Sequence, residues 1–429
     1  MKIKLIAPAW RDRMWKDDRP LFPPLSLAVV AALTPAGADV VILDEGVEEI
    51  DYDEPVDMVG ITAMTAAAPR AYAIGDEFRR RGVPVVLGGM HPSAVPEEAL
   101  VHADAVVVGE AEEVWPGLVR DCLEGRMRRL YRGNGRPSLS GLPRPRRDLF
   151  RKGSYLIPNT VQTTRGCPFA CSFCAVSKFF GHSYRFRPVQ EVVAELEEMS
   201  GQHVVFVDDN IVGNPGYAKE LFKAITPLGI RWFSQGSLNM AEDAELLDLA
   251  ARSGCMGMFI GFESLTPANL KDIRKGANHV QRYRDAIDRI HSHGIAIEGA
   301  FIFGLDHDTR GVFEETIRFA KENRLEAAQF GILTPLPGTD LYRRLEEENR
   351  ITSRDWAKYN IANVVFKPKN MSTAVLQEGF KRAWLEFYSY TSILYRLGLA
   401  RKHGSFLWAL NMGFHERVMR LLQPAAGET

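Results

Sequence analysis

Three cysteines lie close together in the segment TTRGCPFACSFCAVSKF. Cys167 and Cys171 are separated by three residues, and Cys171 and Cys174 by two. Three thiolates at this spacing can bind one face of a metal cluster, because soft sulfur ligands suit iron–sulfur clusters and zinc. A closed zinc site needs a fourth ligand, and His182 is the candidate for that alternative. In a four-iron cluster, three cysteines leave one iron free to bind a cofactor or substrate.

The composition describes a globular protein of 429 residues, long enough for two to three domains. Its 53 basic and 54 acidic residues give a net charge of -1, so no global basic field exists to attract nucleic acid or an anionic membrane. The N-terminus lacks the apolar core of a signal peptide, and the longest apolar run, residues 24–33, is too short to span a bilayer. These features predict a cytoplasmic protein.

The first third of the chain alternates short β-branched runs with helical periodicity, which is typical of a doubly wound, Rossmann-like α/β domain. Strands are expected at 2–7, 39–43, 58–62, 84–89 and 105–109, and helices at 25–36, 66–81 and 96–102. We assign residues 1–130 to this domain. Because the stretch 124–145 is rich in Arg, Gly, Pro and Ser, it indicates a linker, which we place at 131–155.

A second alternation follows the linker. Strands are expected near 158–163, 203–207, 230–234, 257–262, 295–303 and 327–333, with helices at 189–199, 244–252 and 313–322 among them. Six such units predict a partial (βα)6 barrel over 156–350, since the full eightfold barrel needs about 250 residues. From residue 351 the pattern becomes helical, which defines a C-terminal helical domain over 351–429.

Polar or glycine residues follow each predicted barrel strand, where the active sites of parallel barrels lie. They are Asp208, Asp209 and Asn210 after the second strand, Gln235 and Ser237 after the third, Gly261, Phe262, Glu263 and Ser264 after the fourth, Gly304 after the fifth, and Thr334, Pro335, Pro337 and Gly338 after the sixth. Any one of them could instead cap a helix, pair with an arginine or form a turn. Their joint placement favours a binding site.

At the three cysteines the sequence resembles the radical S-adenosylmethionine (radical SAM) superfamily, whose motif has this spacing and an aromatic residue, here Phe173, before the last cysteine. The resemblance implies a [4Fe-4S] cluster and bound S-adenosylmethionine. It also implies that the GFES segment contacts this cofactor, with Glu263 as its best polar ligand. The expected cofactor contacts in the barrel are Phe173, Asp208, Asp209, Gln235, Ser237, Gly261, Glu263 and Ser264.

The N-terminal domain resembles the cobalamin-binding domain of one radical SAM class. The resemblance lies in PPLSLAVVAAL, DMVGITAMT, VVLGGMHPSAVPEEAL and ADAVVVGEAEEVW. Doubly wound sheets bind ligands at their carboxyl edge, and glycines there let the backbone approach a bulky ligand. The expected edge residues are Thr62, Met64, Gly88, Gly89, Met90, His91 and Glu110. The Asp-x-His-x-x-Gly element of some cobalamin proteins is absent, and His91 is expected to be a solvated or capping residue.

Aromatic and basic residues concentrate near the C-terminus. They are Trp384, Phe387, Tyr388, Tyr390, Tyr395, Phe406, Trp408, Arg396, Arg401, Lys402, Arg417 and Arg420. One hypothesis is that this segment covers the barrel mouth and receives an amphiphilic or lipid-like substrate, with peripheral membrane contact. The alternative is a helical cap whose aromatic residues pack on the barrel. Nothing in the segment resembles an RNA-binding module.

The resemblance implies a cobalamin-dependent C-methyltransferase acting on an unactivated carbon of a small molecule, with an electron donor of flavodoxin or ferredoxin type. Two alternatives stay open. One is a radical SAM cyclase, isomerase or other carbon-skeleton enzyme with an empty or structural N-terminal domain. The other is a metal or cobalamin sensor without catalysis.

Overall fold

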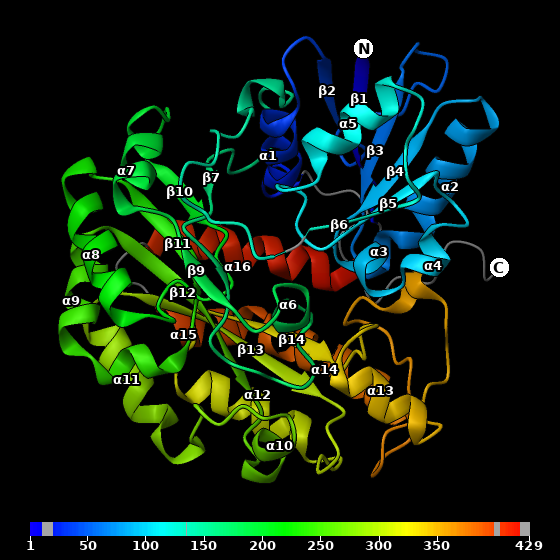
Figure 1. Cartoon of the computed structure of the whole chain (residues 1–429). Helices are drawn as coiled ribbons and strands as arrows, with labels where there is room; N and C mark the ends of the chain where they lie inside the picture. Colours follow the sequence, from blue (N-terminus) through cyan, green and yellow to red (C-terminus); the bar gives the residue numbers. More distant parts are fainter. Residues whose placement is uncertain (11–19, 134, 399–403, 421–429) are drawn as a thin grey trace.

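A computed structural model describes the chain except for residues 11–19, 134, 399–403 and 421–429. Two α/β units, each built on a parallel sheet, lie side by side and are followed by a helical segment (Figure 1). Both sheets have six strands. The predicted fold class, a doubly wound domain followed by a partial barrel and a helical C-terminus, is confirmed.

The N-terminal sheet has the strand order β2-β1-β3-β4-β5-β6, and every pair in it is parallel. Its strands are β1 (Lys2–Ala7), β2 (Asp39–Asp44), β3 (Met58–Thr62), β4 (Val85–Gly88), β5 (Ala105–Val108) and β6 (Leu130–Arg132). Its helices are α1 (Leu25–Leu33), α2 (Ala68–Arg80), α3 (Met90–Ala94), α4 (Pro96–Ala99) and α5 (Trp115–Leu123). Separate apolar clusters pack on its two faces, as expected for strands that read as continuous apolar runs.

Strand β6 lies within the stretch predicted as linker. It pairs with β5, and Tyr131 is buried there with its hydroxyl donating to Asp121 Oδ2 at 2.8 Å. The sheet therefore extends through Arg132, beyond the boundary expected at residue 130. Three residues with a single buried side chain give no usable periodicity, which explains the error.

The second sheet has the order β14-β13-β12-β11-β10-β7 and is parallel throughout. Its strands are β7 (Thr160–Val161), β10 (His203–Phe206), β11 (Arg231–Gly236), β12 (Cys255–Glu263), β13 (Ala296–Phe303) and β14 (Ala327–Ile332). The helices of this region are α6 (Ala175–Phe179), α7 (Val189–Glu197), α8 (Pro215–Ile225), α9 (Ala244–Arg252), α10 (Pro267–Asp272), α11 (Tyr283–Ser292), α12 (Val312–Glu322) and α13 (Asp340–Glu347). This is the predicted partial barrel. A separate antiparallel ribbon of β8 (Thr164–Gly166) and β9 (Tyr184–Phe186) follows β7.

The helical segment consists of α14 (Thr373–Phe387), α15 (Tyr390–Leu397) and α16 (Gly404–Met419). Trp384 Nε1 donates to Phe330 O at 3.0 Å, and Tyr388 Oη donates to Ala328 O at 2.9 Å. These bonds satisfy backbone carbonyls of β14, the last strand of the sheet, which would otherwise be an open edge. Helix α14 and the residue that follows it, Tyr388, therefore cover the β14 edge of the sheet.

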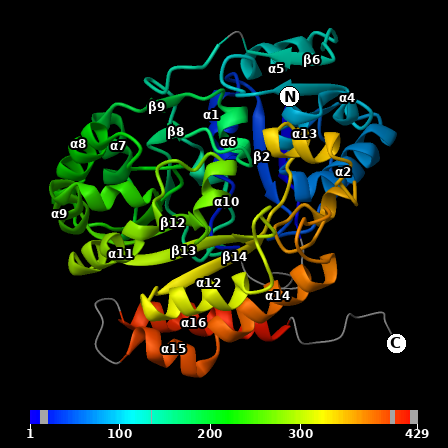
Figure 2. The ribbon, with the colours of Figure 1, turned by 90° about the horizontal axis from the view of Figure 1, so that it is seen from below.

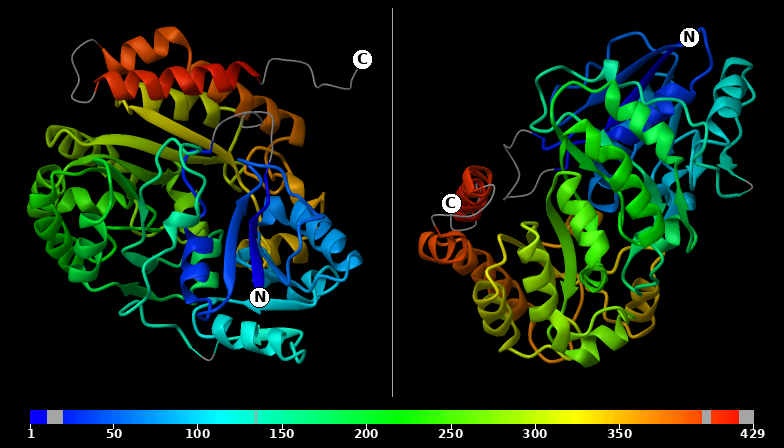
Figure 3. Two further views of the ribbon diagram at one scale, coloured as in Figure 1. Left: turned by 90° about the horizontal axis from the view of Figure 1, so that it is seen from above. Right: turned by 90° about the vertical axis from the view of Figure 1, so that its left-hand side faces the viewer.

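The segment does not cover the mouth of the barrel with α15 and α16. Arg396 donates to the carbonyls of Leu325 and Glu326, which precede β14 and so mark the amino end of the barrel. The N-terminal domain and these helices lie on different sides of the barrel strands (Figures 2 and 3). The aromatic residues Trp384, Phe387 and Tyr388 are buried, which supports the helical cap over a substrate cover.

Of the other predicted residues, some are exposed and some pack against the barrel. Tyr390 and Tyr395 are 61% and 55% exposed, whereas Phe406 packs on Phe233 with ring centroids 5.3 Å apart. Arg401 and Lys402 lie outside the described residues. Within the described part of the chain, none of the helices has the length and apolar character needed to cross a membrane.

Candidate active site

The three cysteines lie on the loop between β8 and α6. Cys171 is buried, Cys167 and Cys174 are partly buried, and Asn210 Nδ2 lies 3.8 Å from Cys167 Sγ. Burial raises the pKa of all three thiols, that of Cys171 to about 11, and the neighbouring thiols add to the effect at Cys171. A bound metal cluster would stabilise the thiolate forms of these cysteines.

No three His, Cys, Asp or Glu side chains among the described residues converge as ligands of a single metal ion. His182, the candidate fourth zinc ligand, lies in a turn with a left-handed backbone (φ 55°). Its amide donates to Ser177 O at 2.7 Å.

Two adjacent aspartates after β10 hold the start of the cysteine loop. Asp208 is fully buried and accepts hydrogen bonds from the amide and hydroxyl of Thr163 and from the amide and hydroxyl of Thr164. Asp209 accepts from the Gly166 amide at 3.0 Å. Burial raises the pKa of each carboxyl to about 6. Asp208 thus braces the backbone, and only Asp209 reaches the barrel cavity.

A cavity of about 300 Å³ opens inside the carboxyl end of the barrel. Five of the eight predicted cofactor contacts line it: Phe173, Asp209, Gln235, Gly261 and Glu263. The other three are Asp208, Ser237 and Ser264, which lie outside its wall. Ser237 bonds to Asn210 and Asn239, and Ser264 bonds to Thr266 and Asn269. These three side chains stabilise the loops, because they form hydrogen bonds with neighbouring loop residues and do not line the cavity.

Glu263 and Lys275 form the charged pair of this cavity. Lys275 Nζ lies 2.8 Å from Glu263 Oε1, and both side chains are at most 15% exposed. Glu263 has a left-handed backbone (φ 65°), a conformation that costs energy in a non-glycine residue and often marks a functional site. The sequence reasoning missed Lys275, because a lysine in the segment KDIRKGAN has no periodicity or motif that distinguishes it from a surface residue.

Glu298 is another acidic group inside the barrel, in addition to Asp209 and Glu263. It lies on β13, two residues before Ala300, which lines the cavity, and its register partner Phe259 on β12 also lines it. Burial raises the pKa of Glu298 to about 7. Within the described part of the chain it has neither a hydrogen bond nor an ion pair. It is therefore a carboxyl that the folded barrel favours in its protonated form.

This carboxyl makes stability depend on pH. Because its pKa is raised in the folded state, its contribution to stability falls as pH rises from about 4.5 to about 7. Glu298→Gln stays neutral at every pH. Its unfolding free energy minus that of wild type should therefore increase by on the order of 2 kcal/mol between pH 5 and pH 8. Denaturant unfolding at both pH values measures this, with exposed Glu378→Gln as the control. Parallel pH profiles of wild type and Glu298→Gln would contradict it.

A second cavity of about 300 Å³ lies at the carboxyl edge of the N-terminal sheet. Of the predicted edge residues, Thr62, Gly88, Gly89 and Glu110 line it. The floor is apolar and includes Leu5, Gly60, Val86, Val107 and Trp115. The barrel side contributes Gln162, Arg165, Phe179, Phe180 and Val207. The cavity therefore lies between the two domains, and its barrel-side wall includes residues that come shortly before the cysteine loop in the sequence.

Gly89 shows why the edge needs a glycine. Its φ is 98°, and a Cβ there would lie 2.9 Å from Ala63 O. The turn after β4 can therefore be this tight only without a side chain. The neighbouring Gly88 differs, because a Cβ there would meet only Val107 Cβ, at 3.8 Å.

The other three predicted edge residues lie outside the cavity wall. Met64 is 65% exposed, and Met90 begins α3. His91 is fully buried, so the expected solvated role is wrong. Its Nε2 lies 3.0 Å from Tyr72 Oη, and its ring packs on Trp356 with centroids 5.1 Å apart. His91 thus joins the N-terminal domain to the chain after the barrel.

Family models match both halves of the chain. A model described as the radical SAM superfamily matches residues 161–320, and one described as a B12 binding domain matches residues 19–119. A third, a domain of unknown function, matches residues 339–404.

Several curated proteins are similar over most of this chain. The bacteriochlorophyllide d C-12(1)-methyltransferase of Chlorobaculum tepidum is 36% identical, covering 99% of this chain and 94% of that protein. The C-8(2)-methyltransferase of the same organism is 33% identical over 89% of this chain and 88% of its own length. The hopanoid C-2 methylase of Rhodopseudomonas palustris is 26% identical over 86% and 72%.

The fold is also similar to solved structures. The radical S-adenosylmethionine methyltransferase TsrM from Kitasatospora setae, with cobalamin and a [4Fe-4S] cluster bound, superposes with a TM-score of 0.71 at 17% identity, covering 98% of this chain and all of that chain. This similarity concerns the fold, and the identity and extent of the curated relatives, with the two family models, show that the chain belongs to the radical SAM enzymes that carry an N-terminal B12-binding domain.

Proposed function

We propose that this protein is a cobalamin-dependent radical SAM methyltransferase, which methylates an unactivated carbon of a small, amphiphilic molecule. The observation that carries the proposal is the position of the inter-domain cavity. Gln162 and Arg165 form part of its wall and lie just before Cys167 on the chain. A methyl group carried in the N-terminal domain would therefore lie next to the cluster loop.

The residues present fit the groups that the family uses. Cys167, Cys171 and Cys174 would hold three irons of a [4Fe-4S] cluster, and the cavity around Thr62, Gly88 and Gly89 would hold a corrinoid. When bound, these groups supply reductive cleavage of S-adenosylmethionine to a 5'-deoxyadenosyl radical and a cobalt that carries a methyl group. The protein positions them and excludes water.

The barrel cavity provides both polar and apolar contacts. Glu263, Lys275, Asp209 and Gln235 can bind the charged and hydroxyl groups of S-adenosylmethionine. The rest of the wall is largely apolar and includes Phe259, Ile302, Ile332, Leu333, Leu336 and Ile361. Such a wall favours a hydrophobic or amphiphilic substrate. Two of the relatives, at 36% and 33% identity, are named as bacteriochlorophyllide d methyltransferases, which makes bacteriochlorophyllide d the first candidate substrate to test.

The test uses anaerobically reconstituted protein with hydroxocobalamin, a chemical reductant, S-adenosylmethionine labelled in its methyl group, and bacteriochlorophyllide d. We expect 5'-deoxyadenosine, S-adenosylhomocysteine and a labelled substrate, measured by mass spectrometry. Protein lacking the corrinoid is the control and should transfer no label. A cytoplasmic location and a flavodoxin or ferredoxin donor stay predictions.

The outcomes separate the three hypotheses. Formation of 5'-deoxyadenosine without any label transfer, either to substrate or to the corrinoid, would favour a carbon-skeleton enzyme. Absence of 5'-deoxyadenosine from protein that holds the cluster would favour a sensor.

A further inference from the structure

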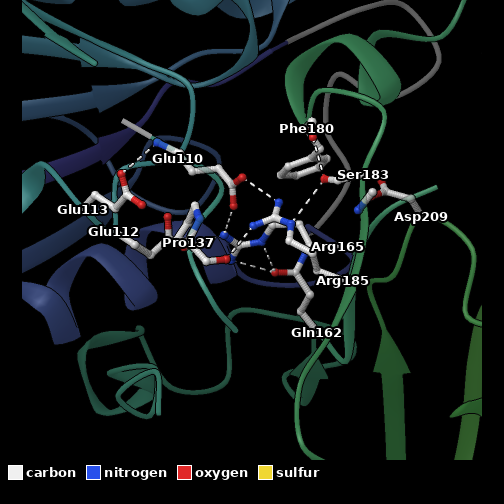
Figure 4. Close-up of polar contacts among 12 residues, drawn as sticks. Glu110, Glu112, Glu113, Pro137, Gln162, Arg165, Phe180, Ser183, Arg185 and Asp209 are labelled. Carbon is white, nitrogen blue, oxygen red and sulfur yellow. Dashed lines mark hydrogen bonds and ion pairs between the residues drawn. The ribbon is translucent and has the colours of Figure 1, made fainter. Parts of the chain in front are cut away.

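Two arginines and two glutamates form a buried network between the domains (Figure 4). Arg165 Nη1 lies 2.5 Å from Glu110 Oε2 and 2.6 Å from Glu112 Oε1. Arg185 Nη2 lies 2.6 Å from Glu110 Oε1. The four side chains are between 8% and 16% exposed. The two charges of each sign balance, so the network joins the domains without leaving a net charge buried.

Each domain supplies one sign of charge. Glu110 and Glu112 follow β5 of the N-terminal sheet, whereas Arg165 lies on β8 and Arg185 on β9. Glu110 bridges both arginines through its two oxygens. Arg185 also donates to Pro137 O at 2.7 Å, and Arg165 donates to Gln162 Oε1 at 3.1 Å. The network therefore fixes the β8–β9 ribbon to the edge of the N-terminal sheet.

The ribbon carries the cysteine loop. Strand β8 ends at Gly166, the residue before Cys167, and β9 begins ten residues after Cys174. The ribbon is a separate two-stranded sheet, and such a ribbon is marginally stable without outside contacts. On the barrel side it is held by Asp208, which accepts from the amide and hydroxyl of Thr164, and by Asp209, which accepts from the Gly166 amide. On the other side it is held by the N-terminal domain through Arg165 and Arg185.

The network thus links the ribbon that carries the loop to the wall of the inter-domain cavity. Arg165, Glu110 and Glu112 all line that cavity. Methyl transfer requires reacting atoms about 3 to 3.5 Å apart, and a misplacement of about 1 Å can cost on the order of 100-fold in rate. A residue that ties the loop to the cavity wall is well placed to control this distance.

We propose that Arg165 is a positioning residue, which sets the distance between the cluster and the corrinoid through its bridge to Glu110 and Glu112. This inference rests on the proposed function. Arginine suits the role because its planar fork can bind two carboxylates at once, whereas lysine presents a single ammonium group. The competing explanation is that the network only stabilises the interface.

The experiment compares wild type, Arg165→Met and Arg165→Lys, each loaded anaerobically with cluster and hydroxocobalamin and normalised to protein that holds both. The first readout is magnetic. With cobalt as Co(II) and the cluster reduced by dithionite, the cluster enhances the electron-spin relaxation of cobalt in a distance-dependent manner. Arg165→Met should weaken this relaxation enhancement or spread it over a wider range of rates. Arg165→Lys should restore part of the wild-type enhancement.

The second readout is methyl transfer from S-adenosylmethionine to the corrinoid, with titanium(III) citrate as the reductant that produces Co(I). The methyl carbon forms a bond to cobalt with the cobalt electron pair. The carbon–sulfur bond breaks, and sulfur keeps its pair as S-adenosylhomocysteine. Arg165→Met should lower the rate of this step on the order of 100-fold, with Arg165→Lys in between.

The matched control is Arg350→Met. Arg350 is also a buried arginine, bonded to Asp306 and Glu348, and it lines neither cavity. It should lower stability without changing either readout. Wild-type relaxation and wild-type transfer in doubly loaded Arg165→Met would overturn the proposal, as would equal losses in Arg350→Met. If wild type holds both groups but transfers no methyl, the proposed function fails, and the magnetic readout still decides the role of Arg165.

Discussion

Protein in which Cys167, Cys171 and Cys174 are all changed to alanine is expected to hold no [4Fe-4S] cluster and to form no 5'-deoxyadenosine. The three thiols are the protein ligands that their spacing and shared burial provide, and without them iron has no soft anionic ligand. Iron and sulfide counts, the visible absorbance of the cluster and product analysis measure the loss. The fold should persist, because Cys167 and Cys174 are only partly buried and Cys171 is still 9% exposed.

The matched control is Cys255→Ala. Cys255 is buried in β12 at 2% exposure, away from the loop, so its loss should leave the iron content unchanged. The cluster assignment would be wrong if wild-type protein reconstituted with iron and sulfide retained stoichiometric zinc instead. It would also be wrong if the triple variant kept a full iron and sulfide count.

The second large effect is expected at the floor of the inter-domain cavity. Gly88→Leu should prevent corrinoid binding while leaving the iron–sulfur cluster in place. Gly88 lines the cavity, and a Cβ there meets only Val107 Cβ at 3.8 Å. The backbone thus tolerates a side chain at this position, and that side chain occupies space a corrinoid needs.

Gly88 is a sharper test than Gly89. At Gly89 any side chain would meet the Ala63 carbonyl and require φ near 98°, so a loss of binding there would also follow from a distorted turn. The control is Gly117→Leu on α5 of the same domain, where a Cβ meets nothing within 4 Å. Bound corrinoid is measured by optical spectrum and cobalt count after desalting. Stoichiometric corrinoid in Gly88→Leu would show that binding occurs elsewhere.

The two carboxyl groups after β10 show where prediction from sequence stopped. Asp208 and Asp209 are adjacent and of the same type, and both were predicted to contact the cofactor. In the structure Asp208 is enclosed by the backbone of Thr163 and Thr164, whereas Asp209 lines the cavity. Neighbouring residues at the end of a strand point in different directions, and the path of the loop decides which one meets the lumen.

The sequence by itself determined the fold class, the order of the domains and the three candidate cluster ligands. These depend on local properties: the alternation of apolar runs with helical periodicity, and the spacing of three thiols along a few residues. The tertiary structure alone decided that Lys275 pairs with Glu263 and that Arg165 meets Glu110 and Glu112. It also buried His91 under Trp356 and placed α15 and α16 away from the barrel mouth. Such partners are far apart in the chain, and charge and periodicity carry no information about which distant surface a side chain will contact.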